Sequence, residues 1–371
     1  MCRIIFLIFG LSLMVGIVHL TAQEAAKTVK GECKSGDCKN GKGIYIWVNS
    51  AKYDGEFKNS ELTGTGSYID DDGDRYEGQF KDGQLQGKGK VEYRNGDKCS
   101  GEFFQGKIVG DGECSYKNGD RYKGQFKNDI KDGNGTFIFA NGDKYTGAFV
   151  KGHFHGNGLF VFTNGNRYEG QFENSKVSGE GTFLFSNGDK YTGQMKDNLP
   201  NGKGVHVDAT GRKYDGQFQN GKKTGTGVLI LPNGTRYEGQ FLDGILNGKG
   251  TMTVPNIGKY EGEFKDNRPH GSGAFIDVKG GRHAGQYKDG KQSGEGKQYK
   301  GDKLVYEGQF SEGKRNGMGS MIQDDGVRMT GQFKNNKPFG RVTLYKDGKK
   351  TGEATCDETG NCVTIETDEK K

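Results

Sequence analysis

The sequence predicts an all-β chain: an elongated, single-layer antiparallel meander of about thirteen 23-residue β-hairpin repeats with a capping hairpin at each end. Three observations predict it: a motif of rings and glycines that returns at a constant step, an alternation of apolar and polar residues inside each unit, and turn residues at both ends of the unit. The composition agrees, because 371 residues include 67 Gly and 11% aromatic but only 31% hydrophobic residues. Such a chain suits a thin sheet covered by one layer of rings.

The repeating unit begins with five residues, Tyr53 to Phe57, which define positions 1 to 5. Their pattern of ring, glycine and ring returns every 23 residues, thirteen times, without an insertion. A second mark, Gly-x-Gly at positions 12 and 14, recurs thirteen times in phase, from Gly41 and Gly43 to Gly317 and Gly319. A constant period of this length indicates a repeat architecture.

Each unit contains two segments with the alternation of a β-strand. In residues 76–80 the odd positions are ring, glycine and ring, and in residues 133–139 the rings again fall two apart. The polar residues 81–86 separate the two segments, and Asn-Gly pairs such as Asn95-Gly96 separate the units. Turns at both ends of the unit predict an up-and-down meander that advances two strands per repeat. At about 4.8 Å per strand, thirteen units extend on the order of 120 Å before twist.

The first 22 residues differ from the rest. Arg3 precedes an apolar run from Ile4 to Val18, and the small residue Ala22 follows. This order is typical of a cleavable secretory signal, and the run is short for a membrane span. We therefore expect export to the periplasm, the cell envelope or the secreted fraction, with an uncleaved membrane anchor as the alternative.

The remaining chain divides into three expected segments. Residues 23–40 are a degenerate N-terminal cap, residues 41–342 are the repeat array, and residues 343–371 are a C-terminal cap with a charged tail. The residues from Leu344 to Glu353 have the pattern of a shorter variant hairpin, which suits a cap because an open sheet exposes pairing edges.

Residues 76–89, which read Tyr-Glu-Gly-Gln-Phe-Lys-Asp-Gly-Gln-Leu-Gln-Gly-Lys-Gly, resemble the MORN (membrane occupation and recognition nexus) repeat. The resemblance covers roughly residues 41–342. It implies a single twisted, extended antiparallel sheet, a repeat without catalytic residues, and a role as a scaffold or accessory module. The best-known members of the family are intracellular, so the apparent export signal is a departure from the family pattern.

The two faces of the predicted sheet differ. With the turn centred between positions 8 and 9, we expect position 1 to lie opposite 16, position 3 opposite 14 and position 5 opposite 12. The rings at positions 1, 5, 16 and 18 then share one face with the glycines at positions 3 and 14. We interpret this face as the core of the ribbon; a stacking platform for sugars or bases is the alternative.

The opposite face carries a basic ladder, because the residue before position 1 is basic in twelve of thirteen copies. Position 2 is acidic in seven copies, so opposite charges alternate and stabilise a solvated sheet. A surface that binds acidic polymers or phospholipid headgroups is the alternative interpretation. The ladder consists of Lys52, Arg75, Lys98, Arg121, Lys144, Arg167, Lys190, Lys213, Arg236, Lys259, Arg282 and Arg328.

Six cysteines follow the apparent signal, in three close pairs: Cys33 with Cys38, Cys99 with Cys114, and Cys356 with Cys362. Zinc ligation by Cys-x4-Cys and Cys-x5-Cys is possible chemistry, but the pairs lie too far apart along the ribbon to form one four-ligand set. Disulfides in an oxidising compartment fit better and agree with export.

The central pair is the most specific of the three. Cys99 replaces the position-1 Tyr and Cys114 the position-16 hydrophobe of one repeat, and these positions face each other across a hairpin. Directly opposed residues have Cα atoms about 4.5–5.5 Å apart, which is within the range of a disulfide.

We expect no enzyme, cofactor or metal site. His153 and His155 are interpreted as turn residues, and Asp70 to Asp74 as an inter-repeat turn without the rest of a calcium loop. The formal charge of +6 is small and dispersed, which argues against nucleic acid. The sequence therefore favours a monomeric, non-enzymatic scaffold with a protein partner. An anionic membrane, glycan or envelope polymer bound by the ladder is the alternative.

Overall fold

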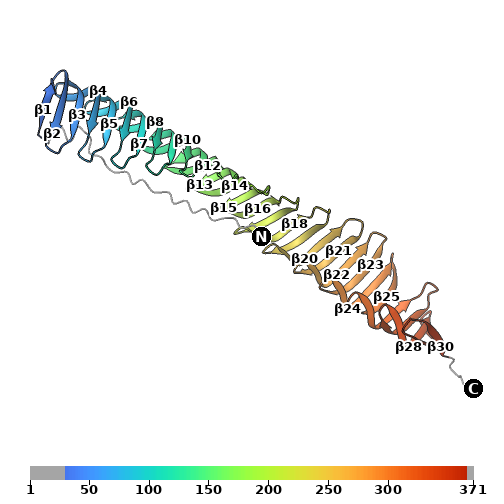
Figure 1. The fold of residues 1–371 in the computed structure, drawn as a ribbon. Helices are drawn as coiled ribbons and strands as arrows, with labels where there is room; N and C mark the ends of the chain where they lie inside the picture. The colour runs from blue at the N-terminus through green and yellow to red at the C-terminus, as the bar shows by residue number, and fades with distance from the viewer. Residues whose placement is uncertain (1–29, 366–371) are drawn as a thin grey trace, which may run out of the picture. The chain divides into compact units, whose positions relative to one another are not determined.

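The computed structural model describes residues 30–365, and the expected signal segment lies outside them. Every regular element in this range is a β-strand, so the all-β prediction is confirmed (Figure 1). The chain divides into two compact units, residues 1–199 and 200–371, each of which is described by itself. No helix in the described range has the length and apolarity needed to cross a membrane.

The first unit contains β1 (Gly31–Gly36), β2 (Lys42–Trp47), β3 (Lys52–Lys58), β4 (Glu61–Ile69), β5 (Arg75–Lys81), β6 (Gln84–Glu92), β7 (Lys98–Phe104), β8 (Lys107–Ser115), β9 (Arg121–Lys127), β10 (Ile130–Ile138), β11 (Lys144–Val150), β12 (His153–Val161), β13 (Arg167–Glu173), β14 (Lys176–Leu184) and β15 (Lys190–Lys196).

The second unit contains β16 (Leu199–Val207), which starts at the junction, β17 (Lys213–Gln219), β18 (Lys222–Ile230), β19 (Arg236–Leu242), β20 (Ile245–Val254), β21 (Gly258–Lys265), β22 (Arg268–Asp277), β23 (Gly281–Lys288), β24 (Lys291–Lys300), β25 (Lys303–Ser311), β26 (Lys314–Ile322), β27 (Arg328–Lys334), β28 (Lys337–Lys346), β29 (Lys349–Cys356) and β30 (Cys362–Ile365).

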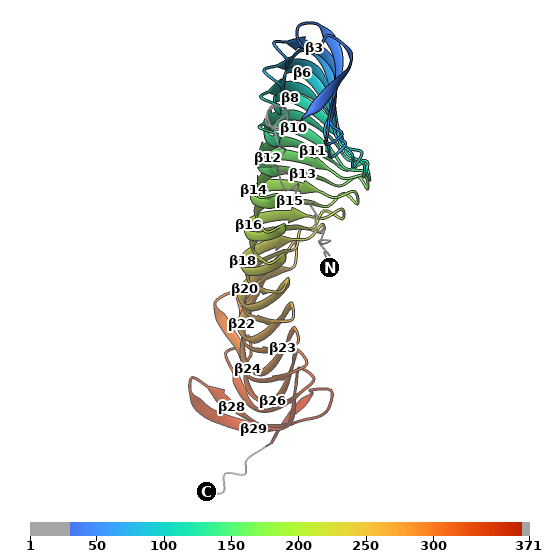
Figure 2. The same cartoon turned by 90° about the vertical axis from the view of Figure 1, so that its left-hand side faces the viewer.

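Within each unit, every strand pairs antiparallel with its neighbours in the sequence. Each unit is thus an open, single-layer meander, as the repeat predicts. Figure 2 shows the strands after a quarter turn; they are bent rather than flat.

The turn inside each hairpin is a two-residue turn. In the β5–β6 hairpin Lys81 pairs with Gln84, and Asp82 and Gly83 both have positive φ, 49° and 77°. Two successive residues with positive φ are the mark of a type I′ turn, whose twist matches the flanking strands. The turn is therefore centred between positions 7 and 8, one residue earlier than the sequence analysis placed it.

The turn between units has a different geometry. The N–H of Gly142 donates to the carbonyl of Phe139 at 2.8 Å, and the N–H of Phe139 donates to the carbonyl of Asp143 at 2.9 Å. Gly142 has a φ of 90°, whereas Asn141 does not have positive φ. This is a three-residue hairpin loop, a type I turn followed by a glycine in the left-handed region.

The register confirms two of the three expected pairings. Tyr145 lies opposite Phe160 and Gly147 opposite Gly158, as positions 1 with 16 and 3 with 14 require. The expected pairing of position 5 with 12 is wrong, because Phe149 lies opposite Phe154, at position 10. A β-bulge causes the difference: two extra residues of β12 lie between these pairs.

The bulge explains two features of the repeat. Gly133, at position 12, has a φ of 107°, which favours glycine. The bulge also leaves the N–H of position 13 without a strand partner. In this hairpin the N–H of Asn134 donates to Oε1 of Gln125 at 2.8 Å, which explains the glutamine at position 4.

The core is a row of tyrosines that lie flat over the glycines. The fully buried Tyr145 covers Gly147 and Gly158, where an added Cβ would come within 2.5 Å of its ring. Its ring stacks on Phe154 with centroids 3.9 Å apart. Full burial of such a ring contributes about 1.5–3 kcal/mol. Glycine at positions 3 and 14 is therefore required by close approach.

Candidate binding surface

The basic ladder lies on the face opposite the tyrosines. Eleven of its twelve cations are exposed and Lys52 is half-buried, whereas the neighbouring position-1 residues are mostly buried. Position 17 lies directly opposite the ladder on both sides: Lys144 pairs with Ile138 on one neighbouring strand and with Val161 on the other. The ladder therefore lies in one row with position 17.

Position 17 is aliphatic in most units, which the sequence analysis did not identify. Ile138, Val161 and Leu184 expose 38%, 39% and 41% of their surface between the cations of the ladder. The sequence contains this pattern as a Val, Ile or Leu one residue after the position-16 core residue. We call this the cation–aliphatic row. In the first unit it consists of Arg121, Ile138, Lys144, Val161, Arg167, Leu184 and Lys190, and in the second of Val207, Lys213, Ile230, Arg236, Lys259, Ile276 and Arg282.

Among residues 30–365, seven ladder cations form ion pairs, mostly with the acid at position 2 of the same strand. Arg167 lies 2.9 Å from Glu169, and Arg236 lies 2.8 Å from Glu238. Exposed pairs of this kind contribute about 1 kcal/mol or less. The other ladder cations that form ion pairs are Arg75, Lys98, Lys213, Lys259 and Arg328.

Within the described range, five ladder cations have no carboxylate within ion-pair distance: Lys52, Arg121, Lys144, Lys190 and Arg282. Arg282 stacks instead on Tyr299, 5.1 Å from the ring centroid. Three of the five lie between β9 and β15, so the first unit presents unneutralised positive charge there.

The charged face is hollowed over β5 to β10. The hollow has a volume of about 830 Å³, and residues of the ladder and of positions 2, 15 and 17 form most of its lining. Glu77 lies between two cations there, because it forms ion pairs with both Arg75 and Lys90. These two cations hold the pKa of Glu77 below its usual value, with the Lys90 hydrogen bond as the larger cause. The hollow is a charged, water-accessible surface.

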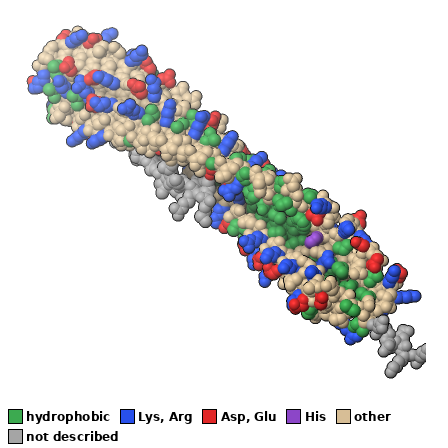
Figure 3. Space-filling model, turned by 45° about the vertical axis from the view of Figure 1, so that its right-hand side comes forward, with side chains coloured by type: hydrophobic (Ala, Val, Ile, Leu, Met, Phe, Trp, Pro, Cys, Tyr) green, Lys and Arg blue, Asp and Glu red, His purple; other side chains and the backbone are tan. Residues whose placement is uncertain are grey.

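The aromatic face is not completely closed. In the first unit the half-buried rings of position 18 contact the rings of position 16: Phe160 and Phe162 have centroids 4.4 Å apart, and Phe162 and Phe183 6.0 Å apart. Figure 3 shows apolar side chains gathered into a patch with a histidine beside it. The rings pack mainly on one another, which supports the interpretation of this face as a core.

Lys131 is an unexpected cation on the aromatic face. It occupies position 10, which is Leu, Ile, Phe or Val in several other hairpins. Its Nζ lies 4.9 Å from the ring centroids of both Tyr116 and Phe137. Burial lowers the pKa of Lys131 to about 8, against the opposing effect of Asp120 and Asp97.

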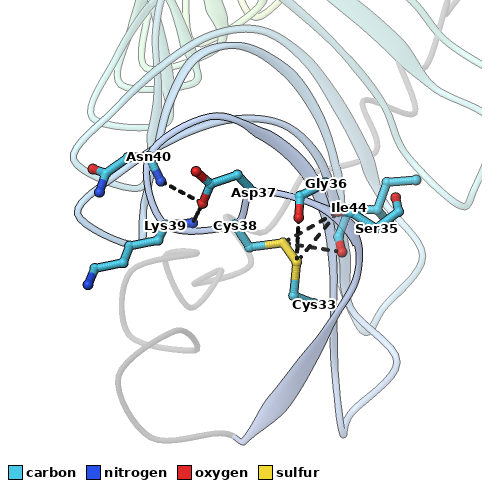
Figure 4. Close-up of a disulfide and its surroundings, with 8 residues drawn as sticks. All are labelled: Cys33, Ser35, Gly36, Asp37, Cys38, Lys39, Asn40 and Ile44. Atoms are coloured by element: carbon cyan, nitrogen blue, oxygen red, sulfur yellow. Dashed lines mark hydrogen bonds between the residues drawn. A yellow bond between two sulfur atoms is a disulfide. The ribbon is translucent and has the colours of Figure 1, made fainter.

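The three expected cysteine pairs are all at disulfide distance. Cys99 lies directly opposite Cys114 in the β7–β8 hairpin, with Cα atoms 4.1 Å apart. Cys356 and Cys362 are likewise opposed across β29 and β30. Cys33 and Cys38 connect β1 to the turn that follows it (Figure 4).

The turn beside Cys38 is held by Asp37. Its Oδ1 accepts hydrogen bonds from the N–H groups of Lys39 at 2.9 Å and Asn40 at 3.0 Å. These two backbone N–H groups, Asn40 first, lower the pKa of Asp37.

The two weak sequence candidates have structural partners, but the interpretation of His153 and His155 as turn residues is wrong, because both lie in strand β12. Nδ1 of His153 lies 3.4 Å from the hydroxyl of Ser175, and Oδ1 of Asp70 accepts the N–H of Asp74 at 2.8 Å within its turn. Across residues 30–365, no three His, Cys, Asp or Glu side chains are placed to hold a metal ion.

A family described as MORN repeat matches most of the chain. The matched ranges are residues 39–52, 53–75, 76–98, 99–121, 122–144, 145–167, 168–190, 191–211, 214–236, 237–256, 260–282, 283–304 and 306–328. A comparison with curated protein sequences gave no match.

Solved structures give distant matches. The TCP domain of Drosophila melanogaster SAS-4 (dCPAP), solved with a proline-rich motif of Ana2, is 17% identical with a TM-score of 0.28, over 41% of this chain and 84% of that one. The TCP10 domain of Danio rerio CPAP is 13% identical with a TM-score of 0.19, over 66% and 99%. Virginiamycin B lyase from Staphylococcus aureus is 10% identical with a TM-score of 0.12, over 87% and 97%. These scores are too low to support an argument about fold or partner.

Proposed function

This chain belongs to the MORN-repeat family, and from that premise we propose that it is an exported, non-enzymatic scaffold that binds a protein partner. The observation that carries the proposal is the repetition itself. The same hairpin, with the same exposed and buried positions, recurs at a step of 23 residues, so the chain presents one surface pattern many times. Such a surface suits an extended partner or several copies of a small one.

Export rests on two independent observations. The first residues have the order of a secretory signal, and three cysteine pairs lie at disulfide distance. Disulfides persist in oxidising compartments such as the periplasm or the secretory space. We propose that the signal is cleaved after Ala22, that the mature chain is a disulfide-bonded monomer, and that its ladder is not a nucleic-acid site.

The test is a cross-linking purification of the mature chain from the envelope and secreted fractions of its own cells. We expect a defined protein to co-purify, and the same protein, purified separately, to rebind at 0.5 M salt. Recovery of the chain alone from all exported fractions, or recovery only from the cytoplasm, would contradict the proposal.

A second candidate function is binding of an anionic polymer or membrane surface through the cation–aliphatic row. The unpaired cations of the first unit favour it, because no carboxylate of residues 30–365 lies within ion-pair distance to compete with a ligand. The probes are dextran sulfate and phosphatidylglycerol vesicles, at increasing salt. The affinity must fall steeply with ionic strength, whereas contacts centred on apolar side chains need not weaken.

A matched pair of variants tests this candidate further. One variant replaces the unpaired Arg121, Lys144 and Lys190 by Gln, and the control replaces the paired Arg75, Lys98 and Arg167 by Gln. Both lose three charges from the same face of the same unit. Equal weakening by the two variants would indicate a net-charge effect and not a site.

A further inference from the structure

One repeat of the second unit has lost its apolar side chains at three positions of the aromatic face. His283 stands at position 1, Gln292 at position 10 and Gln298 at position 16, and no other repeat of the array is polar at all three positions. His283 and Gln298 lie directly opposite each other across β23 and β24. Polar residues on the buried face of a sheet cost stability unless they have partners.

The next hairpin adds a cation to this group. Arg315, at position 10 of its repeat, is half-buried, and its Nε donates to Oε1 of Gln298 at 2.7 Å. Its guanidinium lies over Tyr306, 4.8 Å from the ring centroid, and its Nη1 lies 3.3 Å from the sulfur of Met321.

The charge of Arg315 is not neutralised. Burial lowers the pKa of its guanidinium, the one opposing influence is the Tyr306 phenol, and none of the described carboxylates lies within ion-pair distance of it. A half-buried cation without a counter-ion is costly, and replacing such a group by a well-packed apolar one is often neutral or stabilising. Position 10 is a buried leucine in other repeats, at Leu62, Leu85 and Leu246.

The neighbouring amide also offers a donor. Gln292 is only 6% exposed, and its Oε1 lies 3.1 Å from Nδ1 of His283. Its Nε2 makes no hydrogen bond to the described residues. Tyr287 lies opposite Gln292 across the hairpin; its hydroxyl donates to the carbonyl of His283 at 3.5 Å, and burial raises the pKa of its phenol to about 12.

We propose that Arg315, held by Gln298 and flanked by His283 and Gln292, binds the carboxylate of an Asp or Glu side chain in a partner polypeptide that lies on the aromatic face of the second unit. The site offers N–H donors and an uncompensated positive charge, which complement an anionic acceptor. The half-buried Phe275 and Met321 flank it, so apolar side chains should adjoin the acid in the partner. The inference rests on the proposed role in protein binding, and it names the chemistry of one contact.

The test uses the full mature chain and two fluorescein-labelled peptides, Leu-Phe-Glu-Phe-Leu and Leu-Phe-Gln-Phe-Leu, each with blocked ends. Fluorescence polarisation should show at least tenfold tighter binding of the Glu peptide. Arg315→Leu should remove that preference without lowering the thermal midpoint. The control, Arg282→Gln, removes a cation from the opposite face at β23, the strand of His283, and should keep the preference.

Equal binding of both peptides by the wild-type chain would overturn the inference. So would a large loss of stability in Arg315→Leu, which would assign the arginine a structural role. Competition by millimolar acetate as effective as by unlabelled Glu peptide would also overturn it, because the site would then take free organic acids. If a captured partner binds Arg315→Leu as well as the wild type, this inference fails while the proposed function stands.

Discussion

The hydroxyl of Tyr145 donates a hydrogen bond of 2.9 Å to the carbonyl of Ala148, three residues further along the same strand. The register shift of the bulge begins at this point, between Gly147 and Ala148. Tyr122, Tyr168, Tyr191, Tyr214, Tyr260 and Tyr306 make the same bond. The position-1 tyrosine therefore covers the glycines with its ring and completes the backbone hydrogen bonding with its hydroxyl.

Tyr145→Phe should destabilise the chain by about 1 kcal/mol, because it removes the hydrogen bond from the hydroxyl to the Ala148 carbonyl. Urea unfolding measures the loss. The matched control is Tyr237→Phe, whose hydroxyl has no hydrogen-bond partner among residues 30–365, and this variant should change stability little. Equal effects of the two substitutions would contradict the role given to the hydroxyl.

Gly124→Ala should be among the most damaging single substitutions, with a loss of more than about 3 kcal/mol. A Cβ there would lie 2.6 Å from the carbonyl oxygen of Asn134, 2.7 Å from the Tyr122 hydroxyl and against the Cα of Gly135. Gly352→Ala is the control, since its Cβ would meet nothing within 4 Å. Thermal unfolding should separate the two variants; a tolerated Gly124→Ala would refute the close packing.

Replacement of both Cys99 and Cys114 by serine should destabilise the mature chain by roughly 3 kcal/mol, as the chain-entropy argument gives for a loop of this length. The two cysteines are separated by 15 residues. Non-reducing peptide mapping should first recover the linked peptides. A Cys99→Tyr, Cys114→Phe variant restores the ring pair of the family and should regain part of the loss, independently of reductant. Free thiols at both positions in exported protein would disprove the bridge.

Between pH 7 and 9.5 the free energy of unfolding of the wild type should increase relative to that of Lys131→Leu. The folded-state pKa of Lys131 is about 8, below the ordinary 10.5, so in this window the unfolded chain binds more protons and folding gains with pH. Above pH 10 the tyrosines, whose pKa values burial raises, act in the opposite direction, so the measurement stops before that point. Urea unfolding of both proteins at the two pH values tests this; parallel pH profiles would contradict it.

Deletion of residues 145–167, one whole repeat, should leave a folded chain. Stability in a repeat array is approximately a sum of terms between neighbours, and the deletion joins two equivalent hairpins. Circular dichroism and urea unfolding should show a cooperative transition at a modestly lower midpoint. Loss of the β signal would indicate that the repeats are not interchangeable.

The period, the strands and the opposed cysteines were predictable because each depends on residue types that occur at a fixed spacing in the sequence. The bulge was not, because two extra residues leave the alternation of the two faces unchanged. Position 10 lies on the aromatic face with or without them, and the shift gives it position 5 as its partner, as the pairing of Phe149 with Phe154 shows. Lys131 and Arg315 were missed because both occupy position 10, which was expected to belong to the polar turn. The charged face was predicted from the ladder alone, whereas its row with Ile138 and Val161 depends on the pairing.

The bridge between Cys356 and Cys362 has a mechanical consequence. Strand β30 has four residues and, among the described strands, pairs with β29 alone, so a pull on the chain beyond Ile365 would peel it away one hydrogen bond at a time. The disulfide joins the two strands at the opposite end of this short ladder from Ile365. Tension that opens the pairs from Ile365 inward therefore stops at a covalent bond and passes to β29, whose eight residues pair with β28 along most of their length. If a pulling force acts on the C-terminus of such a scaffold, β29 and not β30 is the strand that must detach. Because β29 is longer, its detachment requires a higher force than breaking the hydrogen bonds of β30 alone.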